Sequence, residues 1–249
     1  MSRDLPYEIQ KDDICIVAYP KSGNNYLLFL IGMLLYKTKM DWSNKGDLVQ
    51  NVKEKTVENL PDPHLVWSHE IYNPTYPKVI YLVRDPRDIV ISYYFHHIKY
   101  YPNHFKLNFN GFFEEFLLGK IWPGMWDHHV ESWITNQTNI ENGVLLLKYE
   151  DLLNNTSKEI HKILKFLNLH RTDKEIKEAI EWSSFDNMKS LEEKQKEYLN
   201  PGESADRKIP FVREGRQNGW KSFLNKEQEE KINEKFYITL KKLGYEITN

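Results

Sequence analysis

The sequence predicts an α/β fold, a single domain whose mostly parallel central sheet has helices on both faces. Three short, unbroken apolar runs, at residues 14–18, 78–83 and 143–149, are typical of buried strands. Each is followed by turn or capping residues and then by a helical pattern, and strands that alternate with helices imply βαβ units. No repeat, low-complexity tract or Pro/Gly/Ser linker divides the chain, so we expect one domain over residues 1–249.

The first half of the chain contains the clearest transitions from strand to helix. Residues 14–18 lead into a Tyr-Pro-Lys-Ser-Gly turn, and helical periodicity follows over residues 24–37. The run at 78–83 is followed by Asp85, which can cap a helix, and by Pro86, which suits the first helical position. Both segments therefore predict a buried strand that enters a helix through a tight turn.

The remaining elements have weaker or shorter signals. Residues 64–68 are a further strand candidate, and a helical stretch over residues 157–167 follows the third apolar run. Residues 172–175, Thr-Asp-Lys-Glu, have the form of a capping box, and residues 225–242 are expected to form the last helix. In a sheet of this kind, ligands bind beyond the carboxyl ends of the strands.

Composition limits the partners of the protein. Lysine and arginine number 34 against 36 aspartates and glutamates, a formal net charge of −2, which argues against a basic surface for nucleic acid. The single cysteine, Cys15, excludes an internal disulfide framework. The N-terminal residues form no signal-type apolar region, and the longest apolar run, residues 26–36, is too short to span a bilayer. We therefore expect a cytoplasmic protein with neither a nucleic-acid nor a membrane partner.

Three segments could bind an anion. The turn at residues 19–25 offers backbone N–H groups and a helix N-terminus, and Lys21 adds a positive charge. It is not the Gly-x-x-x-x-Gly-Lys-Ser/Thr loop of nucleotide triphosphatases. At the next strand end, Arg84 can fork onto a phosphate and Ser92 can add a hydrogen bond. Residues 211–221 combine three basic residues, two glycines and a tryptophan. Each segment alone is also compatible with an ordinary turn and solvent-exposed charges, but their joint presence predicts an anion site.

His69 follows the strand candidate at 64–68, so it lies on the ligand-binding edge and is the best candidate for a general base. A lone histidine is more often structural than catalytic. The adjacent pairs His96-His97 and His128-His129 diverge on a helix, so neither pair forms a metal clamp. We therefore expect no metal site.

Residues 19–26, Tyr-Pro-Lys-Ser-Gly-Asn-Asn-Tyr, resemble the 5′-phosphosulfate loop of the PAPS-dependent sulfotransferase family, cytosolic type (PAPS, 3′-phosphoadenosine 5′-phosphosulfate). Residues 84–94 resemble its 3′-phosphate element, and the likeness extends over residues 14–224. It implies a P-loop-kinase-like sulfotransferase fold and transfer of a sulfuryl group from PAPS to a hydroxyl or amine of a small molecule, which releases PAP. Shorter matching motifs are Tyr149-Glu150-Asp151, Ser183-Ser184-Phe185 with Met188, and Arg213-x-Gly215 with Trp220 and Lys221.

The resemblance also implies chemical roles. Lys21 would stabilise the leaving phosphate, and His69 would deprotonate the acceptor, so these two are the expected catalytic residues. The reaction would be an in-line displacement that depends on positioning and charge and requires no metal. The expected nucleotide-binding residues are Lys21, Ser22, Gly23, Asn24, Asn25, Tyr26, Arg84, Ser92, Tyr149, Ser184, Phe185, Met188, Arg213, Glu214 and Gly215.

Several positions depart from the family pattern. Asn24-Asn25 stands where the family has Thr-Thr, Tyr26 stands where it has a tryptophan, and two further departures bear on the chemistry. Trp67 stands where the family often has a lysine, two residues before the catalytic histidine. Glu214 replaces a lysine, which should weaken affinity for the 3′-phosphate unless Arg216 or Arg207 compensates. These departures keep open a catalytically weak protein that binds PAP or PAPS. An ATP-dependent small-molecule kinase is the other alternative, disfavoured by the missing Gly-Lys-Ser/Thr.

The aromatic content, 14% of the chain, indicates where the acceptor binds. Residues 71–76, 95–109 and 121–129 are rich in aromatic side chains and histidine, which suit a flat or cationic small molecule. A phenol, a steroid-like alcohol and a cationic alkaloid all remain open. The family's C-terminal dimer motif survives only as Lys221 and Glu230, so dimerisation also stays open. The expected acceptor-binding residues are Tyr72, Phe95, His96, Phe105, Trp122 and Trp126.

Overall fold

Five strands form the central sheet of the protein, in the order β2-β3-β1-β4-β5, and every neighbouring pair is parallel. The structure is a computed structural model that describes residues 7–101, 106–199, 206 and 208–247. It confirms the predicted α/β class and the parallel sheet. The strands are β1 (Ile14–Ala18), β2 (Val49–Asn51), β3 (Leu65–Ser68), β4 (Lys78–Val83) and β5 (Val144–Lys148).

β1 lies at the centre of the sheet, and all five of its residues are buried. Ile14 pairs with Leu65 of β3 on one side and with Lys78 of β4 on the other. A strand enclosed by neighbours and covered on both faces needs apolar side chains at every position, which explains the unbroken run in the sequence. Ile16 packs into one hydrophobic core and Cys15 into the other, because alternate residues point to opposite faces.

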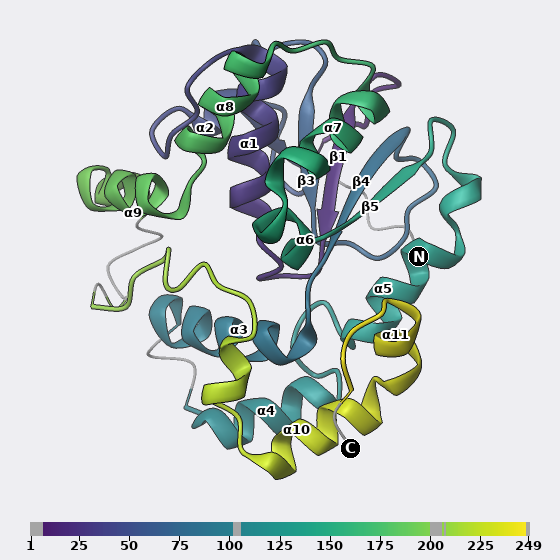
Figure 1. Cartoon of the computed structure of the whole chain (residues 1–249), viewed down its shortest axis with the longest axis vertical. Coiled ribbons are helices and arrows are strands. Elements are labelled where there is room, and N and C mark those ends of the chain that lie inside the picture. Colours follow the sequence, from purple (N-terminus) through teal and green to yellow (C-terminus); the bar gives the residue numbers. More distant parts are fainter. Residues whose placement is uncertain (1–6, 102–105, 200–205, 207, 248–249) are drawn as a thin grey trace.

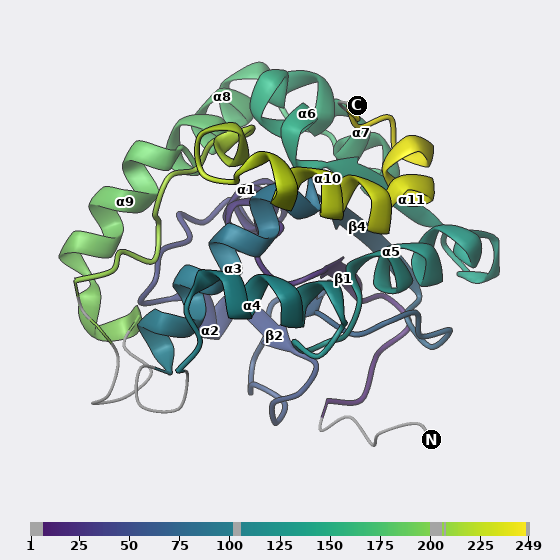
Figure 2. The same cartoon turned by 90° about the horizontal axis from the view of Figure 1, so that it is seen from below.

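Helices cover both faces of the sheet. The core on one face includes residues of α1, α7 and α8, whereas the core on the other includes residues of α3, α4, α5 and α10. Figures 1 and 2 show α3, α4 and α10 gathered together beyond one end of the sheet. The helices are α1 (Asn24–Tyr36), α2 (Lys45–Leu48), α3 (Pro86–Tyr100), α4 (Phe109–Leu117), α5 (Trp126–Thr135), α6 (Tyr149–Asn154), α7 (Thr156–Leu167), α8 (Asp173–Trp182), α9 (Phe185–Lys194), α10 (Lys226–Lys235) and α11 (Tyr237–Lys242).

The predicted helix starts are confirmed. The Asp85 side chain accepts a hydrogen bond from the Arg87 backbone N–H, and Pro86 is the first residue of α3. Thr172 and Glu175 form a capping box at the start of α8. Such caps satisfy N–H groups that have no partner within the helix.

The single helix expected over residues 225–242 is wrong, because α10 ends at Lys235 and α11 begins at Tyr237. Phe236 lies between them with its ring buried, 5.3 Å from the Trp126 ring. The break lets this side chain enter the core, and α10 and α11 both contribute buried residues to the same core. Within the described residues, no helix combines the length and the apolar character needed to cross a bilayer.

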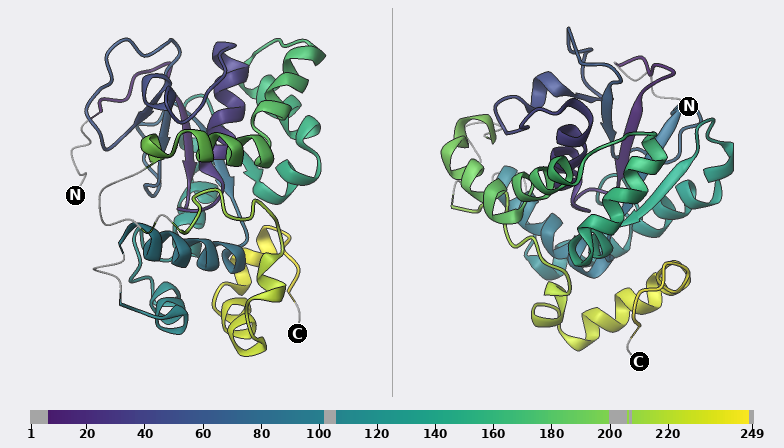
Figure 3. Two further views of the ribbon diagram at one scale, coloured as in Figure 1. Left: turned by 90° about the vertical axis from the view of Figure 1, so that its left-hand side faces the viewer. Right: turned by 45° about the horizontal axis from the view of Figure 1, so that its top comes forward.

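Four of the expected site residues come shortly after strands of the sheet. Because the strands are parallel, these residues lie at the same edge of the sheet. Lys21 comes after β1, His69 after β3, Arg84 after β4 and Tyr149 after β5. The segment that precedes α10 crosses this edge, as the yellow-green stretch in Figure 3 shows. Its residue Phe211 donates a backbone N–H to a carboxylate of α9 and packs 6.2 Å from a tyrosine ring of α3.

Candidate active site

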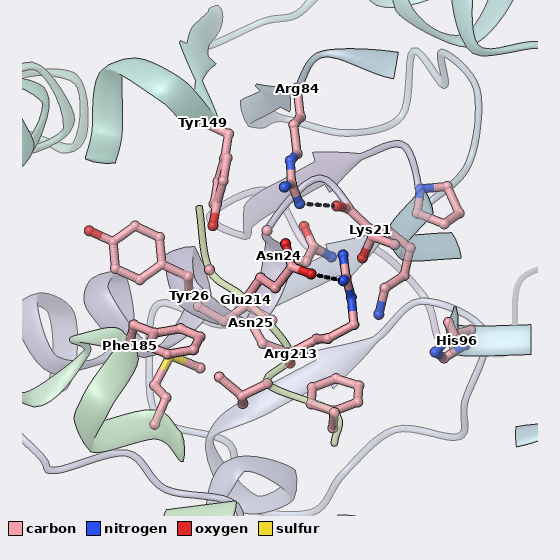
Figure 4. A pocket seen from close by; sticks show the side chains of 18 of the residues that line it. Lys21, Asn24, Asn25, Tyr26, Arg84, His96, Tyr149, Phe185, Arg213 and Glu214 are labelled. Atoms are coloured by element: carbon pink, nitrogen blue, oxygen red, sulfur yellow. Dashed lines mark hydrogen bonds and ion pairs between the residues drawn. The ribbon is translucent and has the colours of Figure 1, made fainter. Parts of the chain in front are cut away.

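A cavity of about 1040 Å³ opens at this edge of the sheet. Its walls come from the strand ends, from α1, α3 and α9, and from the segment before α10. Figure 4 shows part of the lining. Among the residues expected from the sequence, those that line it are Lys21, Gly23, Asn24, Asn25, Tyr26, His69, Arg84, Ser92, His96, Trp122, Tyr149, Ser184, Phe185, Met188, Arg213, Glu214 and Gly215.

The turn after β1, residues 19–25, is called the anion turn below, and it presents the N-terminus of α1 to the cavity. Lys21 has a left-handed backbone (φ 70°), and so has Gly23 (φ 105°), which precedes the first helical residue. No side chain caps this helix, so its first N–H groups remain available to an anion. Ser22 Oγ and Asn24 Oδ1 are buried, and neither has a hydrogen-bond partner among the described residues. Buried polar atoms of this kind require a partner, which an anionic ligand can provide.

Three cations converge on this turn. One terminal nitrogen of Arg84 donates to the Lys21 carbonyl (3.1 Å), as Figure 4 shows. The other donates to the Arg216 carbonyl (3.0 Å). Burial, aided by the positive charges of Arg84 and Arg213, lowers the pKa of Lys21 to about 8. Like charges held together away from water favour the binding of an anion between them.

Aromatic rings line the cavity next to this turn. The ring of Tyr149 packs so closely on Gly23 that a Cβ there would lie 2.5 Å from Tyr149 Cδ2. The ring of Phe185 packs in the same way on Gly215. Tyr26 meets Tyr149 edge to face, with the ring centroids 6.4 Å apart. These rings offer flat surfaces for a planar group beside the anion turn (Figure 4).

His69 lies with its ring between those of Trp67 and Trp122, at centroid distances of 5.1 and 5.9 Å. Its Nδ1 is 2.6 Å from the Ala18 carbonyl oxygen. Because a carbonyl oxygen only accepts hydrogen bonds, Nδ1 carries the proton in this contact and Nε2 keeps a free lone pair. Burial is the main cause that lowers the pKa of His69 to about 4, so the ring is neutral at pH 7.

Glu214 is the acidic residue of the lining. Its carboxylate accepts hydrogen bonds from the guanidinium groups of Arg213 and Arg216, the latter at 2.8 Å. The departure noted in the sequence therefore has a structural consequence, because one carboxylate occupies two of the arginines nearest to the anion turn. Arg207, the other expected compensating residue, lies outside the described residues.

Several expected residues do not line the cavity. Tyr72 packs against Trp133, 5.5 Å between ring centroids, and Trp126 is fully buried. Ser22 is buried beneath the turn, and Phe105 lies outside the described residues. Trp126 was expected from an aromatic segment, but its place in α5 directs it into the core rather than toward the cavity.

Phe95 contributes indirectly. It is not part of the lining, but the Arg213 guanidinium lies over its ring, 4.6 Å from the centroid. The ring therefore supports a cavity cation from behind.

One face of α3, continued by Tyr101 just after the helix ends, lines the cavity. His97, Tyr100 and Tyr101 join His96 there; they belong to the expected aromatic segment 95–109 but were not singled out, whereas Tyr93 was missed altogether. Their spacing of three to four residues is that of one helix face, and this periodicity could have identified them. Lys45, also missed, comes from the four-residue helix α2, for which the sequence has no clear signal.

Fold and site together define an α/β protein with a cation-lined cavity at the carboxyl edge of a parallel sheet. A family model described as "Sulfotransferase domain" matches residues 11–244. The chain belongs to the sulfotransferase family, a class of enzyme, and the predicted resemblance is confirmed.

Curated relatives agree with this assignment, and solved structures share the fold. The chain is 26% identical over 251 residues to the amine sulfotransferase of Oryctolagus cuniculus, covering 94% of the chain and 83% of the relative. It is 30% identical to sulfotransferase 1E1 of Bos taurus, covering 92% and 82%. The structure of mouse sulfotransferase SULT7A1 complexed with PAP superposes with a TM-score of 0.72 at 24% identity, covering 94% and 85%. Retinol dehydratase in complex with retinol and PAP gives a TM-score of 0.76 at 18% identity, covering 94% and 82%.

Proposed function

We propose that the protein transfers the sulfuryl group of PAPS to a hydroxyl of a small, uncharged aromatic acceptor and releases PAP. Solved neighbours of the fold are complexes with PAP, which supports this donor. The observation that carries the proposal is the bond from His69 Nδ1 to the Ala18 carbonyl, because it leaves Nε2 as a base in the cavity that Lys21 also lines.

The residues present fit the donor. The uncapped start of α1, the unpartnered Ser22 Oγ and Lys21 suit a 5′-phosphosulfate. Arg84 has a buried Nε without a hydrogen-bond partner among the described residues, and it suits a second phosphate. The cavity volume of about 1040 Å³ is large enough for a nucleotide and a small acceptor side by side. The expected adenine contacts are Tyr26, Tyr149 and Phe185, with Met188 a further nucleotide contact. Those to the 3′-phosphate are Arg84, Ser92, Arg213 and Gly215.

The chain's own residues then perform three tasks. PAPS supplies an activated sulfuryl group. His69 Nε2 takes the acceptor proton as the new S–O bond forms. Lys21 stabilises the charge that develops on the phosphate oxygen as the old S–O bond breaks, since the electron pair of that bond leaves with the phosphate. The aromatic walls exclude water and hold the acceptor in line.

The lining favours an uncharged acceptor over a cationic one. Glu214 is the only carboxylate among the described lining residues, and two arginines already bind it. Burial lowers the pKa of His96 to about 2, so this ring is neutral as well. The protein's own ammonium groups already lie over aromatic rings that a cation would use, at 4.2 to 5.6 Å: Lys53 over Trp122, Lys21 over Phe211 and Lys45 over Trp67.

Turnover of labelled PAPS with a panel of phenols, alcohols and amines tests the proposal. We expect sulfation of phenols and neutral aromatic alcohols, undiminished by EDTA, and loss of at least about 10²-fold in kcat for His69→Ala and Lys21→Ala. Equal turnover in these variants would refute the mechanism. Phosphoryl transfer from ATP that EDTA abolishes would favour the kinase alternative. Tight PAP binding without turnover would favour the catalytically weak binding protein.

A further inference from the structure

Lys45 occupies a place that the proposed mechanism does not use. Its Nζ donates a 2.6 Å hydrogen bond to Asn25 Oδ1 and lies 5.6 Å from the centroid of the Trp67 ring. Asn25 is on the first turn of α1, in the anion turn, and Trp67 is on β3, two residues before His69. The ammonium group therefore lies between the donor side and the base side of the same cavity.

This ammonium group has hydrogen-bonding capacity to spare. Within the described part of the chain, its side-chain acceptor is the neutral amide of Asn25, and an ammonium has three donors. Burial lowers the pKa of Lys45 to about 8, against a weaker raising effect of Glu54. After burial, the positive charges of Lys21, Lys53 and Lys45, in that order, help to lower the pKa of His69, so the charge of Lys45 lies within electrostatic range of this ring.

We propose that Lys45 is a further catalytic cation, which donates from Nζ to the non-bridging oxygens of the sulfuryl group during its transfer. This inference rests on the proposed function. In the step, the acceptor oxygen bonds to sulfur and its proton passes to His69 Nε2. The bond from sulfur to the phosphate oxygen breaks, and its electron pair leaves with the phosphate. Lys45 keeps its proton throughout and holds the sulfuryl oxygens.

Trp67 completes the arrangement. In the related family this strand position often carries a lysine, whereas here the ring packs under an ammonium that arrives from α2. The aromatic face of Trp67 stabilises the Lys45 ammonium placed over it. A positive charge is therefore kept at this place in the cavity, but it comes from α2 instead of from β3.

Lys45→Met removes the charge and keeps the length of the side chain, and Lys39→Met is the matched control. Lys39 lies over the Trp182 ring and is not part of the cavity lining. Affinities for PAPS and PAP are measured by calorimetry without acceptor, and kcat by turnover of labelled PAPS. For Lys45→Met we expect kcat to fall about 10²-fold and the preference for PAPS over PAP to fall about tenfold, with PAP affinity within about twofold. Lys45→Arg should recover part of both losses.

A relocation variant separates chemistry from structure. In Lys45→Met/Trp67→Lys, a lysine on β3 should restore kcat at least about tenfold over Lys45→Met, because the charge returns to the same place. The inference is overturned if Lys45→Met matches Lys39→Met in kcat and in PAPS preference. It is also overturned if PAP binding falls as much as kcat and Trp67→Lys restores nothing, since Lys45 would then only support the turn. If the wild-type protein binds PAPS but sulfates no acceptor, only the proposed function is refuted. The role of Lys45 is still tested in that case, because Lys45→Met can be compared with the wild type in its preference for PAPS over PAP. Wild-type protein that binds neither ligand would refute both.

Discussion

Replacing Glu214 by glutamine keeps the size of the side chain and removes its negative charge from the cavity. The Glu214 side chain is 34% exposed, that of Arg213 is 22% exposed and that of Arg216 is 57% exposed. A phosphate that binds to Arg213 must first compete with this carboxylate. The variant should therefore bind PAP more tightly than the wild type.

The magnitude follows from the two ion pairs. The Arg216 pair is largely exposed, so its contribution is discounted to about 0.2–1 kcal/mol. The pair with the more buried Arg213 is a charge-assisted hydrogen bond, worth about 1.5 kcal/mol or somewhat more. Because glutamine still accepts a hydrogen bond, only part of this sum is recovered by the ligand. We expect a gain of about 1–2 kcal/mol, which corresponds to about 5–30-fold in the Kd of PAP.

Calorimetric titration of PAP into the two proteins at low and high salt provides the assay. The gain should shrink as salt rises, because the groups are partly exposed and are screened. Glu181→Gln is the control, since it removes the same charge from a surface pair with Lys177, outside the cavity lining. If Glu214→Gln binds PAP no more tightly than Glu181→Gln at low salt, Glu214 does not compete with the phosphate and the reasoning fails.

Three further predictions concern the base, the anion turn and the aromatic residues. His69 acts as a base only when deprotonated and has a pKa of about 4, so kcat/KM should stay level from about pH 5 to 7 and fall tenfold per pH unit below about pH 4. PAPS affinity should fall above about pH 8, because Lys21 then loses its proton. A pH profile of kcat/KM with an acid limb near pH 6.5 would contradict the role of His69. Gly23→Ala places a Cβ 2.5 Å from Tyr149 Cδ2 at a φ of 105°, so it should cost about 1–3 kcal/mol of unfolding free energy and weaken PAP binding. Gly46→Ala is the control, because the added Cβ meets no packed neighbour within 4 Å. It should change neither the stability in thermal melts nor the PAP affinity in titrations. Trp126→Ala should lower the free energy of unfolding in denaturant by about 3–5 kcal/mol, because Trp126 is fully buried. Trp122 is 43% exposed and lines the cavity, so Trp122→Ala should raise the acceptor KM about tenfold at nearly unchanged stability. The reverse pattern would show that the two tryptophans are misassigned.

The sheet and the anion turn could be predicted because their signals are local. Residues 14–18 and 78–83 are unbroken apolar runs, and the structure has strands at these same positions. The carboxyl ends of parallel strands meet at one edge, so Lys21 and Arg84 were expected at the same edge of the sheet once both followed such strands. The helix caps at Asp85 and Thr172 were predictable for the same reason, since a cap depends on residues two or three positions away.

Residues whose position depends on distant parts of the chain could not be assigned in this way. Trp122 and Trp126 belong to one aromatic segment, yet one lines the cavity and the other is buried against Phe236. Nothing within the segment distinguishes them, because the choice depends on where α10 and α11 pack. The break at Phe236 has the same origin, since the helical pattern continues through it in the sequence.

The amino-acid sequence by itself determined the class of fold, the strands that lead to the site and the residues of the anion turn, since each depends on short-range patterns of apolar, small and charged residues. The order of those strands in the sheet came from the tertiary structure. Only the tertiary structure decided that Lys45 reaches Asn25 and Trp67, that Glu214 binds two arginines, and that one face of α3 lines the cavity. Those contacts join residues from elements far apart in the chain, and their strength depends on burial, which is a property of the packed molecule and not of any segment.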